Sequence, residues 1–177
     1  MGLMDFTTDL ELKGETWGAV LDKLVGTPNS NESYKIFSTY YDVFILCASL
    51  GIMYDKTKII ESSDKDLKKL TIGRNVFTAS SRRVEVEFLL TTAIITSKTI
   101  DYTVDERLMI AFGEKDTSFK GLRFLEEFAN FGVDLINDII TNHDLETMEN
   151  LKDMLKDLAH KDLIEDLEID LDLLENN

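Results

Sequence analysis

Apolar residues recur at three- and four-residue intervals along most of this chain, which is the spacing of amphipathic helices. Helix-breaking residues are rare, with one proline and nine glycines in 177 residues. This favours long helices over a turn-rich β fold. Helices are therefore expected over residues 14–26, 40–50, 82–97, 104–112 and 117–140, with a last helix that begins after Asp144.

The segment 40–50 is apolar on nearly every side, so we expect it to be a central core helix. Thr39 and Asp42 have the spacing of a capping box at its start, and Gly51 is expected to end it. The apolar run is about half the ~20 residues that a membrane-spanning helix needs. Cys47, the single cysteine, is expected to be packed and inert, because nothing basic lies near it in the sequence.

The segment 117–140 has the most regular helical pattern, with an apolar stripe that includes Ala129 and Gly132. Two such small residues on one stripe predict that another helix approaches closely there. Asn130 falls on the polar side of this pattern, between two phenylalanines, and packing alone does not explain it.

Residues 57–81 are the least helical part of the chain. Ile59-Ile60 and "LTIGRNVF" (70–77) are expected to contribute a small two-stranded β-ribbon within residues 57–79, with the turn near Gly73. Ser80 or Ser81 is the expected cap of the next helix. The predicted fold is mainly α: one helical bundle over residues 1–160 with this ribbon, and an acidic C-terminal tail over 161–177.

Charge is distributed unevenly. The chain carries a net charge of −15, yet the window from Asp55 to Arg83 has eight basic residues against four acids, and residues 161–177 have seven acids and one lysine. A protein with a net negative charge should not bind DNA nonspecifically, because the phosphates repel it. The basic window could still contact phosphate locally. The candidate nucleic-acid contacts are Lys56, Lys58, Lys65, Lys68, Lys69, Arg74, Arg82 and Arg83. A solvated connection between two helices is the simpler interpretation of that window.

Motifs that carry chemistry are missing from the sequence. It contains no zinc-ligand spacing, no glycine-rich phosphate loop and no Gly-x-Ser-x-Gly elbow. An enzyme would need His143, or the pair Asp105 and Glu106, to converge with other groups in a cleft. We therefore expect no enzymatic activity, no cofactor and no metal site.

Three blocks, "FSTYYDVFILCASLG" (37–51), "TVDERL" (103–108) and "FLEEFANFGVDLI" (124–136), occur in this order. Together they resemble the small proteins called Dnd system-associated protein 4, over roughly residues 35–140. The resemblance implies that the protein is associated with bacterial loci that modify DNA by phosphorothioation or defend against phage. It implies no catalytic residues. Arg107, Glu127 and Asn130 are the matching positions proposed to face a partner.

The leading functional prediction is a cytoplasmic, non-catalytic accessory protein of an anti-phage defence system. It would dock onto a larger nuclease, ATPase or DNA-modifying subunit, with weak or indirect DNA contact and with self-association left open. The acidic tail is a second candidate contact, because "LEIDLDL" alternates with period two like an extended docking peptide; its residues are Asp166, Glu168, Asp170 and Asp172. The alternatives are an acidic, DNA-mimicking inhibitor and a DNA-contacting regulator that uses residues 56–83.

Overall fold

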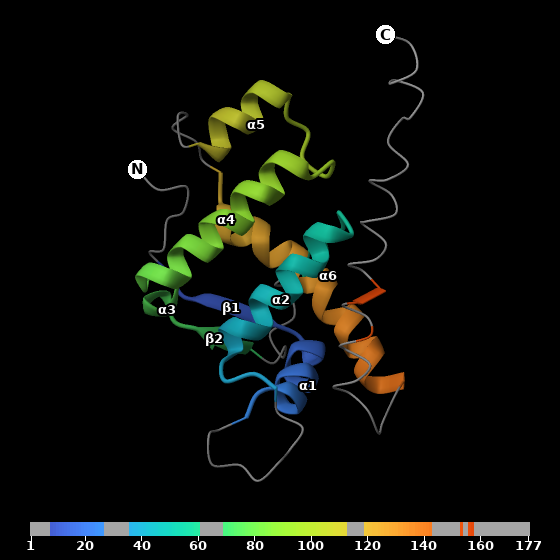
Figure 1. Ribbon diagram of the computed structural model, residues 1–177. Helices are drawn as coiled ribbons and strands as arrows, with labels where there is room; N and C mark the ends of the chain where they lie inside the picture. The colour runs from blue at the N-terminus through green and yellow to red at the C-terminus, as the bar shows by residue number, and fades with distance from the viewer. Residues whose placement is uncertain are drawn as a thin grey trace. The chain divides into compact units, whose positions relative to one another are not determined.

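The computed structural model describes residues 8–26, 36–60, 69–112 and 119–142, together with the helical residues Asp153, Lys156 and Asp157 (Figure 1). Its elements are β1 (Leu10–Lys13), α1 (Glu15–Leu24), α2 (Tyr40–Met53), β2 (Lys69–Ile72), α3 (Arg74–Thr78), α4 (Ser80–Thr96), α5 (Val104–Ala111) and α6 (Gly121–Asn142). The chain divides into two compact units, Met1–Asn137 and Asp138–Asn177. The fold is mainly helical with a small two-stranded sheet, as the sequence predicts.

Helix α2 is the central helix of the first unit. Its predicted capping box is present: the Asp42 amide donates to Thr39 Oγ1 at 3.3 Å, and the Thr39 amide donates to Asp42 Oδ2 at 3.0 Å. The prediction that Gly51 ends the helix is wrong, because the helix continues to Met53. Two residues after its last helical residue, Asp55 has a positive φ of 47°. The amides of Asp55 and Lys56 donate back to the carbonyls of Ile52 and Gly51, both at 3.0 Å, which is the pattern of a Schellman motif.

Gly51 instead allows α2 to cross α6 at close range. A Cβ atom built on Gly51 would lie 2.7 Å from the carbonyl carbon of Phe128, and one built on Gly132 would lie 2.7 Å from the carbonyl carbon of Cys47. Real side chains do not approach a backbone this closely, so both helices need glycine at the crossing. This supports the predicted close approach at Gly132. Cys47 is buried there, as expected, and burial raises the pKa of its thiol.

Asn130 links α6 to α1 inside the core. The indole Nε1–H of Trp17 donates to Asn130 Oδ1 at 2.9 Å, and Asn130 Nδ2 donates to the carbonyl of Lys58 at 3.2 Å. The residue is only 2% exposed. The expectation of a solvent-facing Asn130 is therefore wrong: the polar side chain is inside because it satisfies a buried indole that would otherwise have no partner.

The β-ribbon pairs β2 with β1, a segment near the N-terminus. The two strands are antiparallel, with Leu10 opposite Ile72 and Lys13 opposite Lys69. The expected partner Ile59-Ile60 lies outside both strands, and the residues after Gly73 form the short helix α3. In Figure 1 the ribbon runs between α3 and α1. One of its faces, which carries Leu10 and Ile72, is buried.

An aromatic cluster joins α2 to α3 and α4. Phe77 meets the rings of Tyr41 and Phe44 edge-on, with centroids 5.7 and 6.0 Å apart. The Tyr41 hydroxyl donates to Glu85 Oε2 at 2.7 Å, and burial together with this carboxylate raises the pKa of Tyr41. Helix α4 begins after Ala79 without a side-chain cap, so the prediction of a capping serine at Ser80 or Ser81 is wrong.

The second unit is described in part. It contains the last residues of α6 and the helical residues Asp153, Lys156 and Asp157; Lys156 Nζ lies 3.3 Å from Asp153 Oδ1. The expected cap at Asp144 and the acidic tail 161–177 lie outside the described residues, so the expected boundary at residue 160 stays a prediction. Among the helices that are described, none is long and apolar enough to cross a membrane.

Candidate interaction surface

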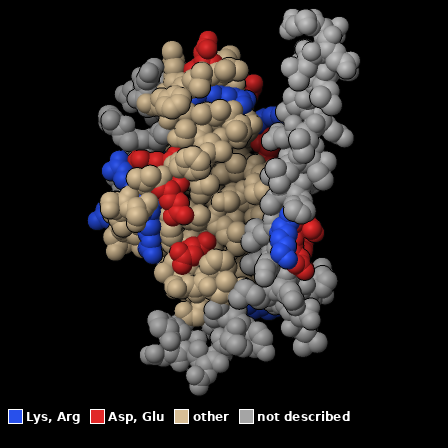
Figure 2. Space-filling view, viewed as in Figure 1, with Lys and Arg blue, Asp and Glu red and all other residues tan. Residues whose placement is uncertain are grey.

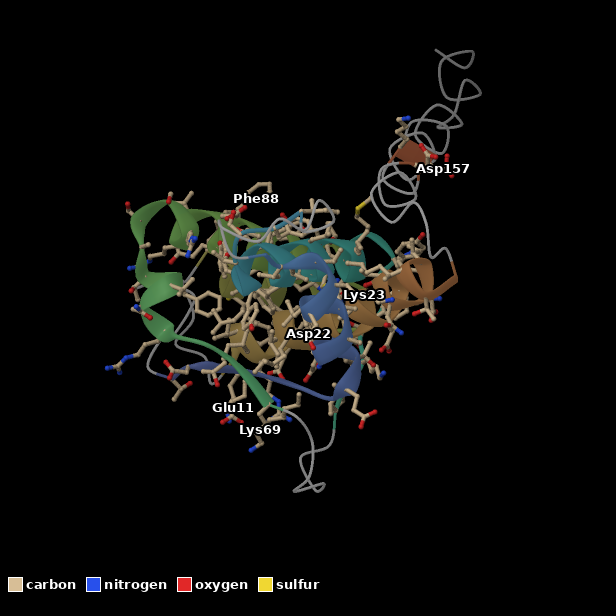
Figure 3. All side chains as sticks on the ribbon, turned by 90° about the horizontal axis from the view of Figure 1, so that it is seen from below. Glu11, Asp22, Lys23, Lys69, Phe88 and Asp157 are labelled. Carbon is tan, nitrogen blue, oxygen red and sulfur yellow. The ribbon has the colours of Figure 1, made fainter. Side chains whose placement is uncertain are left out.

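Helix α4 is apolar on two opposite faces. One face is buried and carries Val86, Leu90, Ala93 and Ile94. On another face, Val84 and Phe88 are 67% and 69% exposed, and Ile95 is also exposed. Phe88 projects away from the helix in Figure 3. Val84, Phe88 and Ile95 fall on one side of the helix, because they are spaced by four and seven residues.

Helix α5 packs beside α4 and contributes little to the core. Its buried residues are Ile110 and Ala111. Val104, at the start of the helix, and Phe112, the residue directly after its end, are 73% and 66% exposed. Leu108 and Met109 are exposed as well.

A polar network around the buried Ser97 fixes the connection between α4 and α5. Arg107 donates to the carbonyls of Ser97, Ile100 and Tyr102, in the last two cases at 2.8 and 3.0 Å. Asp55 accepts from the Ser97 hydroxyl at 2.7 Å and from the Lys98 amide at 3.0 Å. A second capping box, between Thr103 and Glu106, starts α5. The exposed face of α5 is thus held in a defined position without being covered.

We call the two exposed rows together the α4–α5 surface; its residues are Val84, Phe88, Ile95, Val104, Leu108, Met109 and Phe112. The exposed fractions add up to about four whole side chains, or roughly 700 Å² of largely apolar area at ~150–250 Å² per large side chain. This area is a sum over the two rows; the largest contiguous apolar patch on a typical monomer is ~300–600 Å². Uncharged atoms predominate over α4 and α5 in Figure 2, with carboxylates beside them.

The α4–α5 surface was not predicted from the sequence. The signal was an excess of apolar residues in 82–97, more than one buried face can use, and β-branched residues there blurred the helical pattern. Which of two apolar faces is covered depends on tertiary packing.

The described basic residues of the window 56–83 have local contacts, and they are spread over the segment after α2, β2, α3 and α4. Lys56 is 5.6 Å from the centre of the Phe131 ring, and Lys58 forms an ion pair with Asp134. The other contacts are Lys69 Nζ to Glu11 Oε2 at 3.6 Å, the Arg74 amide to Asp9 Oδ1 at 2.8 Å, the Arg82 guanidinium over the Tyr41 ring at 4.8 Å, and Arg83 Nε to Glu87 Oε1 at 2.9 Å. Glu11 and Lys69 lie together on the ribbon in Figure 3. Lys65 and Lys68 lie outside the described residues.

The residues predicted to face a partner are not brought together. Arg107 is turned to the loop carbonyls, Asn130 is in the core, and Glu127 is half-buried beside Arg123, with 3.8 Å between Glu127 Oε1 and Arg123 Nε. Burial raises the pKa of Glu127. The acidic positions Asp166, Glu168, Asp170 and Asp172 lie outside the described residues.

A groove of about 750 Å³ separates β1 from the start of α6. Its charged lining is mixed: Asp9, Glu11, Lys13, Lys120, Arg123 and Glu126. Burial raises the pKa of Glu126, and the nearby Lys13 and Arg123 oppose this shift. Within the described ranges, no group of His, Cys, Asp and Glu side chains could hold a metal ion.

These features define a small helical protein whose α4–α5 surface is open and preorganised. The chain belongs to the family described as DNA sulphur modification system-associated protein 4, whose family model matches residues 21–174. The match confirms the resemblance and extends it into α1 and the acidic tail. Membership associates the protein with a DNA sulphur modification system. Neither the curated proteins nor the solved structures include a match to this chain.

Proposed function

We propose that the protein is a non-catalytic accessory factor that docks, through its α4–α5 surface, onto a larger protein subunit of the DNA sulphur modification system. The observation that carries the proposal is the exposure of Val84, Phe88 and Val104 on two packed helices, and of Phe112 directly after the second. Family membership supports the context in which such a subunit would be found.

The size of the surface suits a protein partner. A standard interface buries ~800 Å² on each side, with an apolar core and a polar rim. The roughly 700 Å² of the α4–α5 surface could form most of such a core. Phenylalanine suits an anchoring position, because interface cores are enriched in aromatic side chains.

The geometry of the connection adds to this argument. Because Arg107 and Asp55 already order the loop before α5, a partner would meet a backbone arrangement that is fixed before binding. Preorganisation of this kind increases affinity without new contacts.

The test is a nuclease-treated pull-down of the tagged protein from its source organism, read by mass spectrometry. The double variant Phe88→Ser/Phe112→Ser is compared with Ile59→Ser, a matched control because Ile59 is 63% exposed but lies outside α4 and α5. We expect the wild type and Ile59→Ser to recover a subunit of the modification system, and the double variant to recover less than about a tenth as much. Equal recovery by the double variant, or recovery of no such subunit by the wild type, would refute the proposal.

A further inference from the structure

Helix α5 has few apolar contacts to hold it in place. It is eight residues long, and isolated helices shorter than ~12–15 residues are barely stable in water. Its buried residues are Ile110 and Ala111, which bury far less apolar surface than the buried face of α4 does. The element that α5 contacts most is α4, which lies next to it in Figure 1. The position of α5 therefore depends on other interactions.

Arg107 supplies several of these interactions. Its guanidinium donates to the carbonyls of Ser97, Ile100 and Tyr102, and this ties α5 to the segment that precedes it. Hydrogen bonds from a charged donor are roughly twice as strong as neutral ones. Arginine presents its donors in a rigid planar fork, whereas the N–H groups of a lysine all leave one nitrogen. A lysine at this position could not serve the same carbonyls together.

Ser97 connects Arg107 to Asp55, which follows α2. The carbonyl of Ser97 accepts from Arg107, and its hydroxyl donates to Asp55 Oδ1 at 2.7 Å. The Lys98 amide donates to Asp55 Oδ2 at 3.0 Å. Ser97 is buried, and polar contacts are stronger at a site with little water. A continuous set of polar contacts thus joins the end of α2, the end of α4 and α5; we call Asp55, Ser97 and Arg107 the α5 latch.

We propose that α5 opens from α4 as a local unit and that the α5 latch keeps it closed, so that Arg107 is the positioning residue of the α4–α5 surface. Segments with few buried apolar contacts are the ones that open at low free energy. The role in docking rests on the proposed function. In the open state the exposed residues of α5 no longer lie beside those of α4, so a partner binds the closed state, and its affinity scales with the closed fraction.

Native-state hydrogen exchange of the free, full-length protein tests the opening. The hydrogen-bonded amides of residues 107–112 should have protection factors at least ~100-fold below those of the most protected amides in α2 and α6. Their exchange should depend weakly on urea, because opening exposes little surface. Arg107→Lys keeps the charge and the helix propensity but loses the fork, so the opening constant should rise about 10- to 100-fold.

Two further variants sharpen this test. Arg123→Lys is the matched control, because it makes the same change in an exposed pair with Glu127 on α6, and it should leave exchange in 107–112 unchanged. Asp55→Asn removes the charge that accepts from Ser97 but keeps a residue type that tolerates positive φ. Its effect should be smaller than that of Arg107→Lys, and the two should be non-additive, because both act through Ser97.

The same variants are then tested for binding to the purified protein subunits of the modification system, each separately. The affinity of Arg107→Lys/Asp55→Asn should fall by the factor by which its closed fraction falls. An affinity that stays at the wild-type value while the closed fraction falls would overturn the positioning role of Arg107.

The exchange experiment separates this inference from the proposed docking. If α5 is as protected as α6 in the wild type, or if Arg107→Lys exchanges like Arg123→Lys, the α5 latch is refuted and the docking proposal stands. If Phe88→Ser/Phe112→Ser binds the subunits like the wild type, the proposed docking fails and the positioning role fails with it, whereas exchange in the free protein still decides whether α5 opens.

Discussion

Substituting Gly132 by alanine tests the close crossing of α2 and α6. The added methyl group would lie 2.7 Å from the carbonyl carbon and 2.8 Å from the Cα atom of Cys47. Both are backbone atoms inside the facing helix, so no side-chain rotation can relieve the clash. The two helices must move apart by several tenths of an ångström, and a gap of that size weakens the dispersion contacts on both sides of the crossing.

The expected loss of stability follows from two opposing effects. Overpacking against a rigid neighbour costs typically ~1–3 kcal/mol, and a clash with backbone belongs at the upper end. Replacing glycine by alanine inside a helix recovers up to ~1 kcal/mol. The net expectation is a loss of about 2 kcal/mol, which lowers the Tm by about 4–8 °C for a chain of this size.

The assay is urea unfolding followed by the fluorescence of Trp17, the single tryptophan. The matched control is Gly73→Ala, because a Cβ there meets only the side-chain amide of Asn75, which can rotate away. The control should change the free energy of unfolding by less than ~0.5 kcal/mol. A Gly132→Ala protein as stable as the wild type would refute the close crossing.

Three further predictions concern buried polar groups. Asn130→Ala should lower the free energy of unfolding by ~1–3 kcal/mol, because the indole N–H of Trp17 loses its buried acceptor. Tyr41→Phe should cost ~1.5–3 kcal/mol, since its hydroxyl donates to the charged Glu85. Burial raises the pKa of Glu126, so the folded state binds this proton more tightly and stability falls as pH rises through the raised pKa. Glu126→Gln should therefore be more stable than the wild type at about pH 7 and equal to it near pH 4; urea titrations at both pH values check this.

Each of these predictions has an outcome that contradicts it. An Asn130→Ala protein with unchanged stability would mean that the indole finds another acceptor. An unchanged Tyr41→Phe protein would mean that the hydroxyl is as well bonded in the unfolded chain. A Glu126→Gln protein that is less stable at neutral pH would show that the attraction of Lys13 and Arg123 for the carboxylate outweighs the effect of its burial.

Interactions between residues close in sequence were the predictable part of this fold. Thr39 and Asp42 of the capping box are three positions apart, and the apolar stripe of α6 repeats every helical turn. Both patterns are therefore visible in a short stretch of sequence. The pairing of β1 with β2 joins Leu10 to Ile72. Strand pairing over such a distance leaves no local signal, and the ribbon was therefore expected with the wrong partner.

The candidate site was harder to predict, because burial is decided by distant partners. Asn130 has the position of a surface residue in its own helix, and only its distant partners, Trp17 and the Lys58 carbonyl, explain why it is buried. Gly51 has a similar ambiguity: glycine serves both helix ends and close crossings, and the sequence does not distinguish them. The exposure of Phe88 likewise depends on which face of α4 meets α2.

Hydrogen exchange measured with and without a purified subunit of the modification system tests the docking surface most directly. The account predicts that the subunit slows amide exchange in α4 and α5, over residues 80–112, and leaves α1 and the β-ribbon unchanged. Protection confined to α1 or the ribbon, or no protection by any subunit at saturating concentration, would contradict it.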